Sequence, residues 1–263
     1  MSGEARWGDL ALRVGSGLAM VAVGAAGIWA GGHWFHALVA LICGVMVWEL
    51  VRMLAPSRPG AARLGLLAGA VAMVAIYLPA GIALPLLLAP ALIGFAVLTE
   101  RRALYATFTL LVLLAGFGMM AVRDDFGTLW MLWLVAVVVT TDVAGYFAGR
   151  LIGGPKFWPR VSPKKTWSGT VAGWLGAGAV GLGFALATKT GAGLAGVSVA
   201  LSMASQIGDI AESAIKRHVG VKDSSTLLPG HGGLLDRFDG MLGASLFLLL
   251  VAQVITFPPV AAP

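Results

Sequence analysis

The sequence predicts an all-α, polytopic integral membrane protein that is built as a helical bundle. Hydrophobic residues make up 59% of the 263 positions and charged residues only 11%, and the mean hydropathy is +0.90. A soluble domain carries about 25% charged residues, so this composition excludes one. A membrane helix needs roughly 20 apolar residues. We expect about nine transmembrane helices, near residues 11–30, 33–54, 62–79, 81–99, 103–122, 128–149, 168–187, 191–212 and 240–257.

The positively charged residues predict the orientation of these helices, because cytoplasmic loops carry an excess of Lys and Arg. With the N-terminus in the cytoplasm and the C-terminus outside, 16 of the 18 basic residues lie on the cytoplasmic side, and only Arg123 and Lys189 lie opposite. The pI near 9.9 then follows from topology and anionic lipid, and nucleic-acid binding is not needed to explain it. The first apolar run is full-length and others follow it, so we expect a membrane helix there and not a signal peptide.

Two polar regions on the cytoplasmic side divide the chain by function. Residues 1–127 contain only spans without a motif, whereas residues 128–263 contain both polar regions and are the expected catalytic part of one continuous unit. The first polar region begins with Asp142, Tyr146 and Arg150, which are four residues apart and share one helix face. This face could bind substrate, or an interaction of Asp142 with Tyr146 or Arg150 could hold helices together.

Small residues and a basic loop accompany this face. Gly145 and Gly149 would let a neighbouring helix or a ligand approach closely. In the following loop 150–167, the segment Ser162-Pro-Lys-Lys-Thr166 places two adjacent lysines between hydroxyl groups. Such a segment suits several phosphate oxygens, although a basic loop is also the ordinary signal of a cytoplasmic position.

Three carboxylates around the eighth and ninth runs are candidate metal ligands. Asp209 lies on an otherwise apolar helix, where a carboxylate is costly unless it is paired, metal-bound or facing water. Asp236 and Asp239 share a helix face where the ninth run begins. The three offer oxygen ligands for Mg²⁺ or another hard cation. The alternatives are pairing of Asp209 with Lys216 and capping of the helix by Asp236.

The charge-dense segment 213–239 connects these two runs. Within it, Pro229-Gly-His-Gly-Gly233 places three glycines around His231. Glycine permits a positive φ or a close approach to a ligand, and exposed amides in such a loop can bind phosphate. His231 could contact a phosphate or bond the loop to itself.

The pattern of this segment resembles the signature of the phosphatidate cytidylyltransferases, also called CDP-diacylglycerol synthases. The matching residues, all at the family's spacing, are Ser213, Lys216, Arg217, Lys222, Asp223, Pro229, His231, Gly232, Gly233, Asp236, Arg237 and Asp239. The Ser162–Thr166 segment, the face from Asp142 to Arg150 and the nine-span layout resemble the same family. Two positions depart from it: Ser168 stands where the family usually has glutamate, and Gly240 where it usually has serine.

The resemblance implies an enzyme of the bacterial inner membrane that joins CTP and phosphatidic acid to give CDP-diacylglycerol and pyrophosphate, with its active site facing the cytoplasm. It implies Mg²⁺ at Asp209, Asp236 and Asp239, and it leaves open a second, monovalent cation and a homodimer. The catalytic residues it implies are Lys216, Arg217, Lys222, Asp223, His231 and Arg237. The substrate-binding residues are Asp142, Tyr146, Arg150, Ser162, Lys164, Lys165, Thr166, Ser213, Gly232 and Gly233.

Two other functions remain as alternatives. The headgroup motifs would also suit a cytidylyltransferase for another lipid phosphate. In an ion-coupled transporter, Asp142 and Asp209 would be the ion-coupling residues. The charges gather at one membrane face and no internal repeat relates the two halves, which argues against the transporter.

Overall fold

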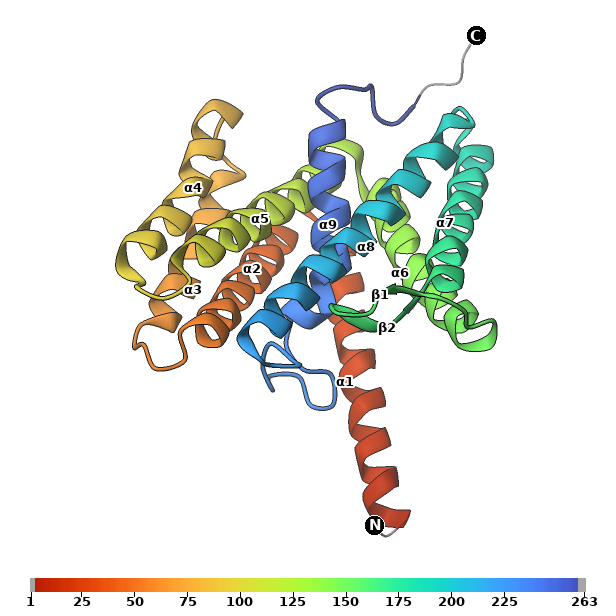
Figure 1. The fold of residues 1–263 in the computed structure, drawn as a ribbon. Coiled ribbons are helices and arrows are strands. Elements are labelled where there is room, and N and C mark those ends of the chain that lie inside the picture. The colour runs from red at the N-terminus through yellow and green to blue at the C-terminus, as the bar shows by residue number, and fades with distance from the viewer. Residues whose placement is uncertain (1–2, 260–263) are drawn as a thin grey trace. The chain divides into compact units, whose positions relative to one another are not determined.

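The computed structural model describes the backbone of residues 3–259 and the side chains of residues 12–259. The described part of the chain forms nine α-helices, one short π-helix and one pair of strands (Figure 1). The elements are α1 (Gly3–Ala30), α2 (Gly32–Leu54), α3 (Ala61–Ala75), α4 (Ala80–Val97), α5 (Arg102–Ala121), η1 (Val122–Phe126), α6 (Thr128–Leu151), β1 (Lys156–Trp158), β2 (Ser162–Thr166), α7 (Trp167–Thr188), α8 (Gly193–Val219) and α9 (Leu235–Val251).

Each of the nine predicted runs overlaps a helix, so the all-α prediction is confirmed. The ninth run was predicted over residues 240–257, but α9 begins at Leu235 and ends at Val251. Among the described residues, seven helices are long and apolar enough to cross a membrane. The other two are α3, with 15 residues, and α9, with 17. The third run was expected to reach Pro79, but α3 ends at Ala75 because Pro79 is already the extended N-cap of α4 and the chain turns before it.

The loop predicted over residues 150–167 contains a small hairpin. Strands β1 and β2 pair antiparallel, with Lys156 opposite Thr166 and Trp158 opposite Ser162. The hairpin ends directly at α7, whose N-cap is Thr166; its hydroxyl accepts a hydrogen bond from the backbone N–H of Gly169 at 3.2 Å. A Thr at this position satisfies one of the free amides of the first helical turn. The basic segment is therefore ordered by the helix that follows it.

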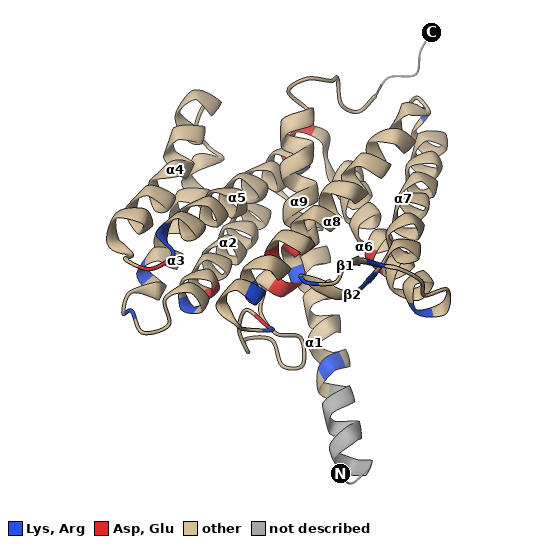
Figure 2. Ribbon diagram, in the orientation of Figure 1, with Lys and Arg blue, Asp and Glu red and all other residues tan. Residues whose placement is uncertain are grey.

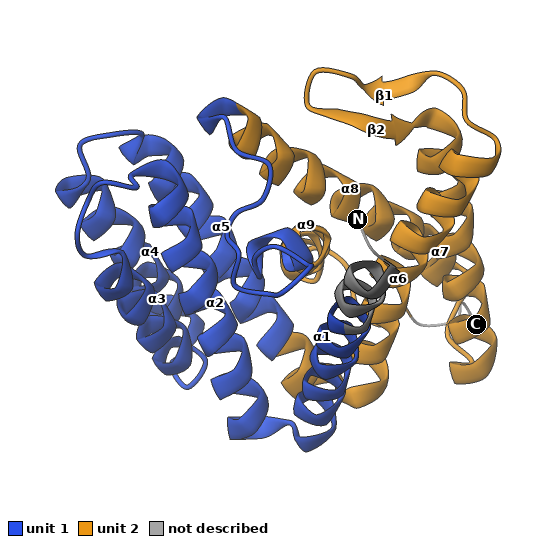
Figure 3. Cartoon of the chain, turned by 90° about the horizontal axis from the view of Figure 1, so that it is seen from below, with its two compact units in different colours: residues 1–120, 218–238 blue, residues 121–217, 239–263 orange. Residues whose placement is uncertain are grey.

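The chain divides into two compact units (Figure 3). Unit 1 contains residues 1–120 and 218–238, and unit 2 contains residues 121–217 and 239–263. In unit 1, α2 and α3 pack with their backbones nearly in contact: a Cβ on Gly65 would lie 2.6 Å from the carbonyl oxygen of Gly44. Within this unit the charged residues of α2, α3 and α5 gather at one end of the helices (Figure 2).

In unit 2, α6 packs against α7, and α8 packs against the part of α9 that belongs to this unit. The indole N–H of the buried Trp133 donates to Ser198 on α8 at 3.1 Å, and the Thr141 hydroxyl donates to Ser202 at 2.8 Å. Ser198 and Ser202 are buried on α8, so the first half of this helix forms a structural network with α6. The later residues of α8 remain for the site.

Candidate phosphate-binding site

A cavity of about 590 Å³ in unit 2 collects most of the predicted substrate-binding residues of that unit. It lies among the end of α6, the strand β2, the start of α7 and the middle of α8. The predicted residues that line it are Asp142, Tyr146, Arg150, Lys164, Lys165, Thr166 and Asp209. Ser162 lies on β2 at the far end of the hairpin, and it is not among the lining residues. The spacing of four residues on α6 therefore does place one face toward a single cavity.

Two glycines allow this cavity to form where α6 meets α7. A Cβ on Gly169 would lie 2.5 Å from the carbonyl oxygen of Gly145, and one on Gly149 would lie 2.9 Å from the hydroxyl oxygen of Thr166. The predicted close approach at Gly145 and Gly149 is confirmed, and the neighbour is a helix of the same chain. Ser168, which departs from the family pattern, donates its hydroxyl to the carbonyl of Gly153. It ties the loop after α6 to the start of α7.

An ion pair crosses the cavity between the lysine segment and α8. The ammonium of Lys165 lies 2.6 Å from the carboxylate of Asp209, and both side chains keep about a quarter of their surface exposed, 24% and 28%. The hydroxyl of Ser213 also donates to this carboxylate at 3.2 Å. The alternative reading paired Asp209 with Lys216; the structure gives Lys216 a carboxylate partner one turn earlier, the buried Glu212, at 2.5 Å. Sequence reasoning missed Glu212, although its spacing from Lys216 was a usable signal.

Three aspartates of unit 2, one of them the Asp209 of this ion pair, form a like-charged group. The carboxylate of Asp239 interacts electrostatically with those of Asp209 and Asp142, and with the ammonium of Lys216. Like charges at close range repel one another, and carboxylate oxygens are the donors that a hard cation prefers. The donor set thus fits a divalent cation in kind. In the part of the chain that the structure describes, no three His, Cys, Asp or Glu side chains already form a metal-binding group.

Tyr146 and Arg150 also interact with each other. The guanidinium of Arg150 donates to the Tyr146 hydroxyl at 2.8 Å. This contact lies within α6 and is not the pairing of Asp142 with Tyr146 or Arg150 that was the structural alternative, which stays a prediction. Both side chains nevertheless line the cavity, so the contact orients them at its edge and does not remove them from it.

In unit 1, a buried glutamate organises the glycine-rich part of the signature. Glu49 of α2 is fully buried and accepts four hydrogen bonds. The donors are the hydroxyls of Ser224 and Ser225, at 3.4 and 2.6 Å, and the backbone amides of Leu234 and Leu235, at 3.0 and 2.8 Å. The two amides open α9, where the first N–H groups lack partners within the helix and favour a negative charge.

Sequence reasoning missed Glu49 because α2 carries no recognisable motif. A carboxylate in the apolar run 33–54 was the signal available to find it, since such a group is costly inside a membrane helix unless it has partners. Its partners lie 175 to 186 residues further along the chain. Only the fold brings them together.

Asp236 holds the same loop from the other side. One of its carboxylate oxygens accepts hydrogen bonds from the amide and the hydroxyl of Ser224, at 2.8 and 2.9 Å, and from the amide of Gly233, at 2.8 Å. Asp236 is the second residue of α9 and these donors precede the helix, so the contacts fix the loop against the first turn and are not the predicted N-cap. Its metal-binding role stays a prediction.

The two carboxylates explain why glycines stand at 232 and 233. Gly232 has a φ of +83°, which favours glycine. A Cβ on Gly232 would lie 2.7 Å from the carboxylate of Asp236, and one on Gly233 would lie 2.5 Å from that of Glu49. Any larger residue would push the loop off the groups that hold it.

His231 is tied to α1. Its Nδ1 lies 2.8 Å from the hydroxyl of Ser16, which also donates to the carbonyl of Pro229 at 3.1 Å. We had left open whether His231 contacts a phosphate or bonds the loop to itself. The structure ties the turn that contains His231 to helix α1 of unit 1.

The remaining signature residues lie on the surface of their own units. Lys222 and Asp223 are exposed in the turn after α8, and Arg237 is exposed in the first turn of α9; all three belong to unit 1. Arg217 is exposed at the end of α8 in unit 2. The signature is therefore shared between the units, with Ser213, Lys216, Arg217 and Asp239 on unit 2 and the rest on unit 1.

Comparison with known proteins gives the family. The phosphatidate cytidylyltransferase of Brucella suis biovar 1 is 49% identical over 139 residues, which cover 52% of each chain. That of Helicobacter pylori is 37% identical over 163 residues, 60% of this chain and 61% of that protein. That of Staphylococcus saprophyticus is 38% identical over 172 residues, 62% and 66% of the two chains.

These matches differ in extent from the match to the family as a whole. The chain spans about half the length of the Brucella relatives that it matches. In contrast, the sequence pattern of the Cytidylyltransferase family matches residues 11–255, which begin within α1 and extend past the end of α9. The family pattern therefore covers more than half of the sequence, and the chain belongs to the cytidylyltransferase family.

Proposed function

We propose that the protein transfers the cytidylyl group of CTP to phosphatidic acid and releases pyrophosphate. The observation that carries the proposal is the unit 2 cavity, in which Arg150, Lys164 and Lys165 meet the carboxylates of Asp142 and Asp209. Family membership and the names of the relatives support the same reaction.

The main obstacle to this reaction is electrostatic. The lipid phosphate must attack the α-phosphorus of CTP, and both reactants are anions. In the proposal Lys164 and Arg150 bind phosphate oxygens of CTP and screen this repulsion, which makes positioning and electrostatics the main contributions to catalysis. A phosphomonoester is already largely dianionic at neutral pH, since its second pKa is about 6, so no strong general base is needed.

Lys165 has a double role in this mechanism. Its ammonium is held by Asp209 at 2.6 Å, so it stands at a fixed place before the nucleotide arrives. The resemblance to the family also gives phosphate-binding roles to Lys216, whose side chain is paired with Glu212, and to the exposed Arg217, Lys222 and Arg237. Ser213 supports the site indirectly, because its hydroxyl orients the Asp209 carboxylate.

A divalent cation belongs to the proposal. Asp209 and Asp239 would hold it, because these carboxylates interact with each other and a cation would relieve their repulsion. When bound, Mg²⁺ would neutralise charge on the reacting phosphates and on the leaving pyrophosphate. Asp142, which interacts with Asp239, would keep the surroundings negative enough to attract the cation.

The location follows from the charge pattern. We propose that the protein lies in the bacterial inner membrane with its N-terminus and its site in the cytoplasm, where CTP is available. The bias of 16 basic residues out of 18 toward one side supports this orientation.

One assay tests the proposal. Purified protein in detergent is given CTP, Mg²⁺ and phosphatidic acid, and both pyrophosphate and a CDP-lipid are measured. Formation of both products in equal amounts is expected. Reaction only with a different lipid phosphate, or no CDP-lipid from any lipid phosphate, would overturn the proposal.

A further inference from the structure

One face of α2 changes from apolar to cationic along its length. Leu41, Val45, Trp48 and Arg52 follow one another at spacings of four, three and four residues, so they share one face of the helix. The rise from Leu41 to Arg52 is about 16 Å at about 1.5 Å per residue. This matches half of a bilayer core of about 30 Å, so an arginine at headgroup depth would lie above a leucine near the midplane.

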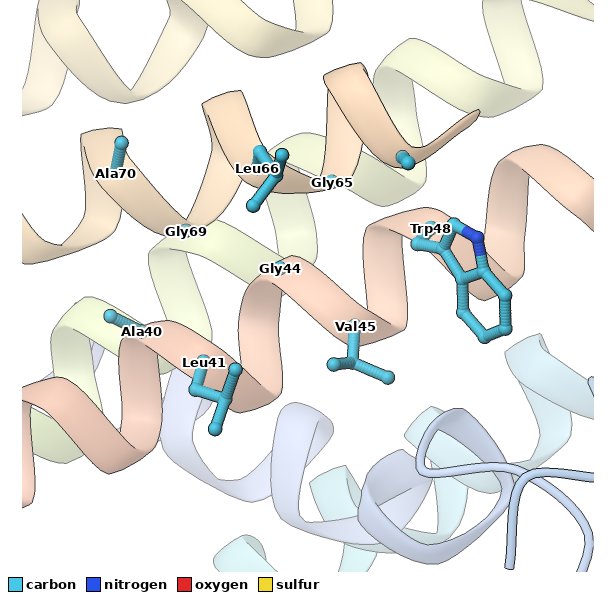
Figure 4. Close-up of a pocket in the computed structure, with 10 residues that line it drawn as sticks. Ala40, Leu41, Gly44, Val45, Trp48, Gly65, Leu66, Gly69 and Ala70 are labelled. Atoms are coloured by element: carbon cyan, nitrogen blue, oxygen red, sulfur yellow. The ribbon is translucent and has the colours of Figure 1, made fainter. Parts of the chain in front are cut away.

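An apolar groove of about 430 Å³ lies along this face, between α2 and α3 of unit 1. Figure 4 shows Val45 and Trp48 on the α2 side and Leu66 and Ala70 on the α3 side. Glycines form the floor of the groove. Gly44 on α2 faces Gly65 and Gly69 on α3, and no side chain lies between the two backbones. The leucines that flank it keep most of their surface exposed, 65% for Leu41 and 75% for Leu66.

A second, polar pocket of about 720 Å³ begins where the groove ends. Trp48 lines both. The guanidinium of Arg52 lies over the Trp48 ring, 5.2 Å from its centroid. Arg101 lines the same pocket and is held in place, because it donates to the carbonyl of Leu54 at 2.8 Å.

The pocket reaches the signature segment. Asp223, Ser225 and Thr226 also line it. Two guanidinium groups against one carboxylate give its charged side chains a net positive charge. Guanidinium groups present planar pairs of donors that match phosphate oxygens, and a phosphomonoester offers three such oxygens and close to two negative charges.

We propose that the groove and the pocket together bind one phosphomonoester lipid, with an acyl chain in the groove that α2 and α3 line and the phosphate between Arg52 and Arg101. This inference rests on the proposed function, in which that lipid is the phosphatidic acid substrate. An apolar groove alone would select no occupant. The positive pocket at its end does, because it complements an anionic headgroup at the depth where headgroups lie.

Two variants and two matched controls test the site. Arg52→Gln removes a phosphate contact, and Ala70→Phe fills the groove from an exposed position on α3. The controls are Arg63→Gln, an exposed arginine outside both cavities, and Val74→Phe, which lies one turn beyond Ala70 and does not line the groove. Native mass spectrometry of the detergent-purified full chain measures the binding of phosphatidic acid and, separately, of phosphatidylglycerol, a phosphodiester lipid.

We expect Arg52→Gln and Ala70→Phe each to weaken phosphatidic acid binding about tenfold, with the controls unchanged. In the enzyme assay the same two variants should raise the KM for phosphatidic acid and leave the KM for CTP as in the parent. A rise in the KM for CTP, equal binding of phosphatidylglycerol, or no loss in either variant would overturn the lipid site. If the parent binds phosphatidic acid through these residues but forms no CDP-lipid, the proposed function fails while the lipid site stands.

Discussion

The carboxylate of Glu49 accepts a hydrogen bond at 2.8 Å from the backbone amide of Leu235, which lies 186 residues further along the chain. One helix of the motif-free N-terminal part thereby holds the start of α9 and the serines before it. The signature segment depends on this distant residue for its shape.

Exchange of Glu49 for Gln should loosen this segment. The side-chain amide would turn an N–H₂ group toward donors that need an acceptor, and an unsatisfied buried donor costs roughly 1 to 3 kcal/mol. We expect a lower melting temperature in detergent and faster amide exchange at residues 224–235. Glu100→Gln is the control, because that side chain is 61% exposed, and it should behave as the parent. Equal stability of the two variants would contradict the role given to Glu49.

Exchange of Gly233 for Ala should damage the loop by a different route. The added Cβ would lie 2.5 Å from the Glu49 carboxylate, inside van der Waals contact. We expect a loss of about 1 to 3 kcal/mol in stability, measured by thermal unfolding. Gly183→Ala in α7 is the control, since a Cβ there meets nothing within 4 Å, and it should be neutral or slightly stabilising.

The two lysines of β2 should separate phosphate binding from ion pairing. Lys164→Ala should raise the KM for CTP roughly tenfold or more, because a charge-assisted contact contributes about 1.5 to 3 kcal/mol. Lys165→Ala should show the same loss and also free the Asp209 carboxylate. Lys189→Ala, at the C-cap of α7, should leave the KM for CTP as in the parent. Parent-like kinetics for both β2 variants would leave the lysines as a topology signal only.

Exchange of Asp209 for Asn tests the metal proposal. Since both partners of its ion pair with Lys165 are about a quarter exposed, 24% and 28%, loss of the pair alone should destabilise the protein by no more than about 1 kcal/mol. Loss of a metal ligand should instead lower turnover by about a hundredfold or more while the protein still folds. Turnover and melting temperature, measured across a Mg²⁺ series, distinguish the two; near-parent turnover would remove Asp209 from the metal site.

Cysteine labelling tests the orientation in the membrane. The native Cys43 is buried, so it should contribute little background labelling. We expect Ser57→Cys and Ser162→Cys to resist an impermeant reagent added to intact cells, whereas Ala192→Cys, in the turn between α7 and α8, should react. The reverse pattern would place the site outside the cytoplasm.

The helices could be predicted well from the sequence because a membrane helix leaves a long, simple signal. The run 33–54 differs from α2 by one residue. The prediction failed where short-range geometry decides the structure. The segment read as a loop contains the hairpin of β1 and β2, which is held by strand pairing and by the cap at Thr166. The third run was predicted to reach Pro79, but α3 stops earlier because Pro79 is the N-cap of the next helix.

The candidate site could be predicted where residues share one helix face, and not where the fold joins distant segments. The α6 face from Asp142 to Arg150 lines the expected cavity. The partner of Asp209 was not foreseen, because Lys165 reaches it only through the hairpin. Arg52 and Arg101 carried no sequence signal beyond a basic loop, and their common pocket follows from the packing of unit 1.

Unit 1 is built from two segments that are far apart in the chain, residues 1–120 and 218–238, and this sets an order of events during biosynthesis. Helix α2 enters the membrane with the Glu49 carboxylate long before the ribosome has made Ser224, 175 residues later, or the amides that open α9. Until then the carboxylate must keep its water or a transient partner, because a bare charge in lipid is costly. A nascent chain that stops after α5 would contain helices α1 to α5. It would still lack the segment 218–238 that completes unit 1. Quality control that senses an exposed intramembrane charge would recognise such a chain as unfinished.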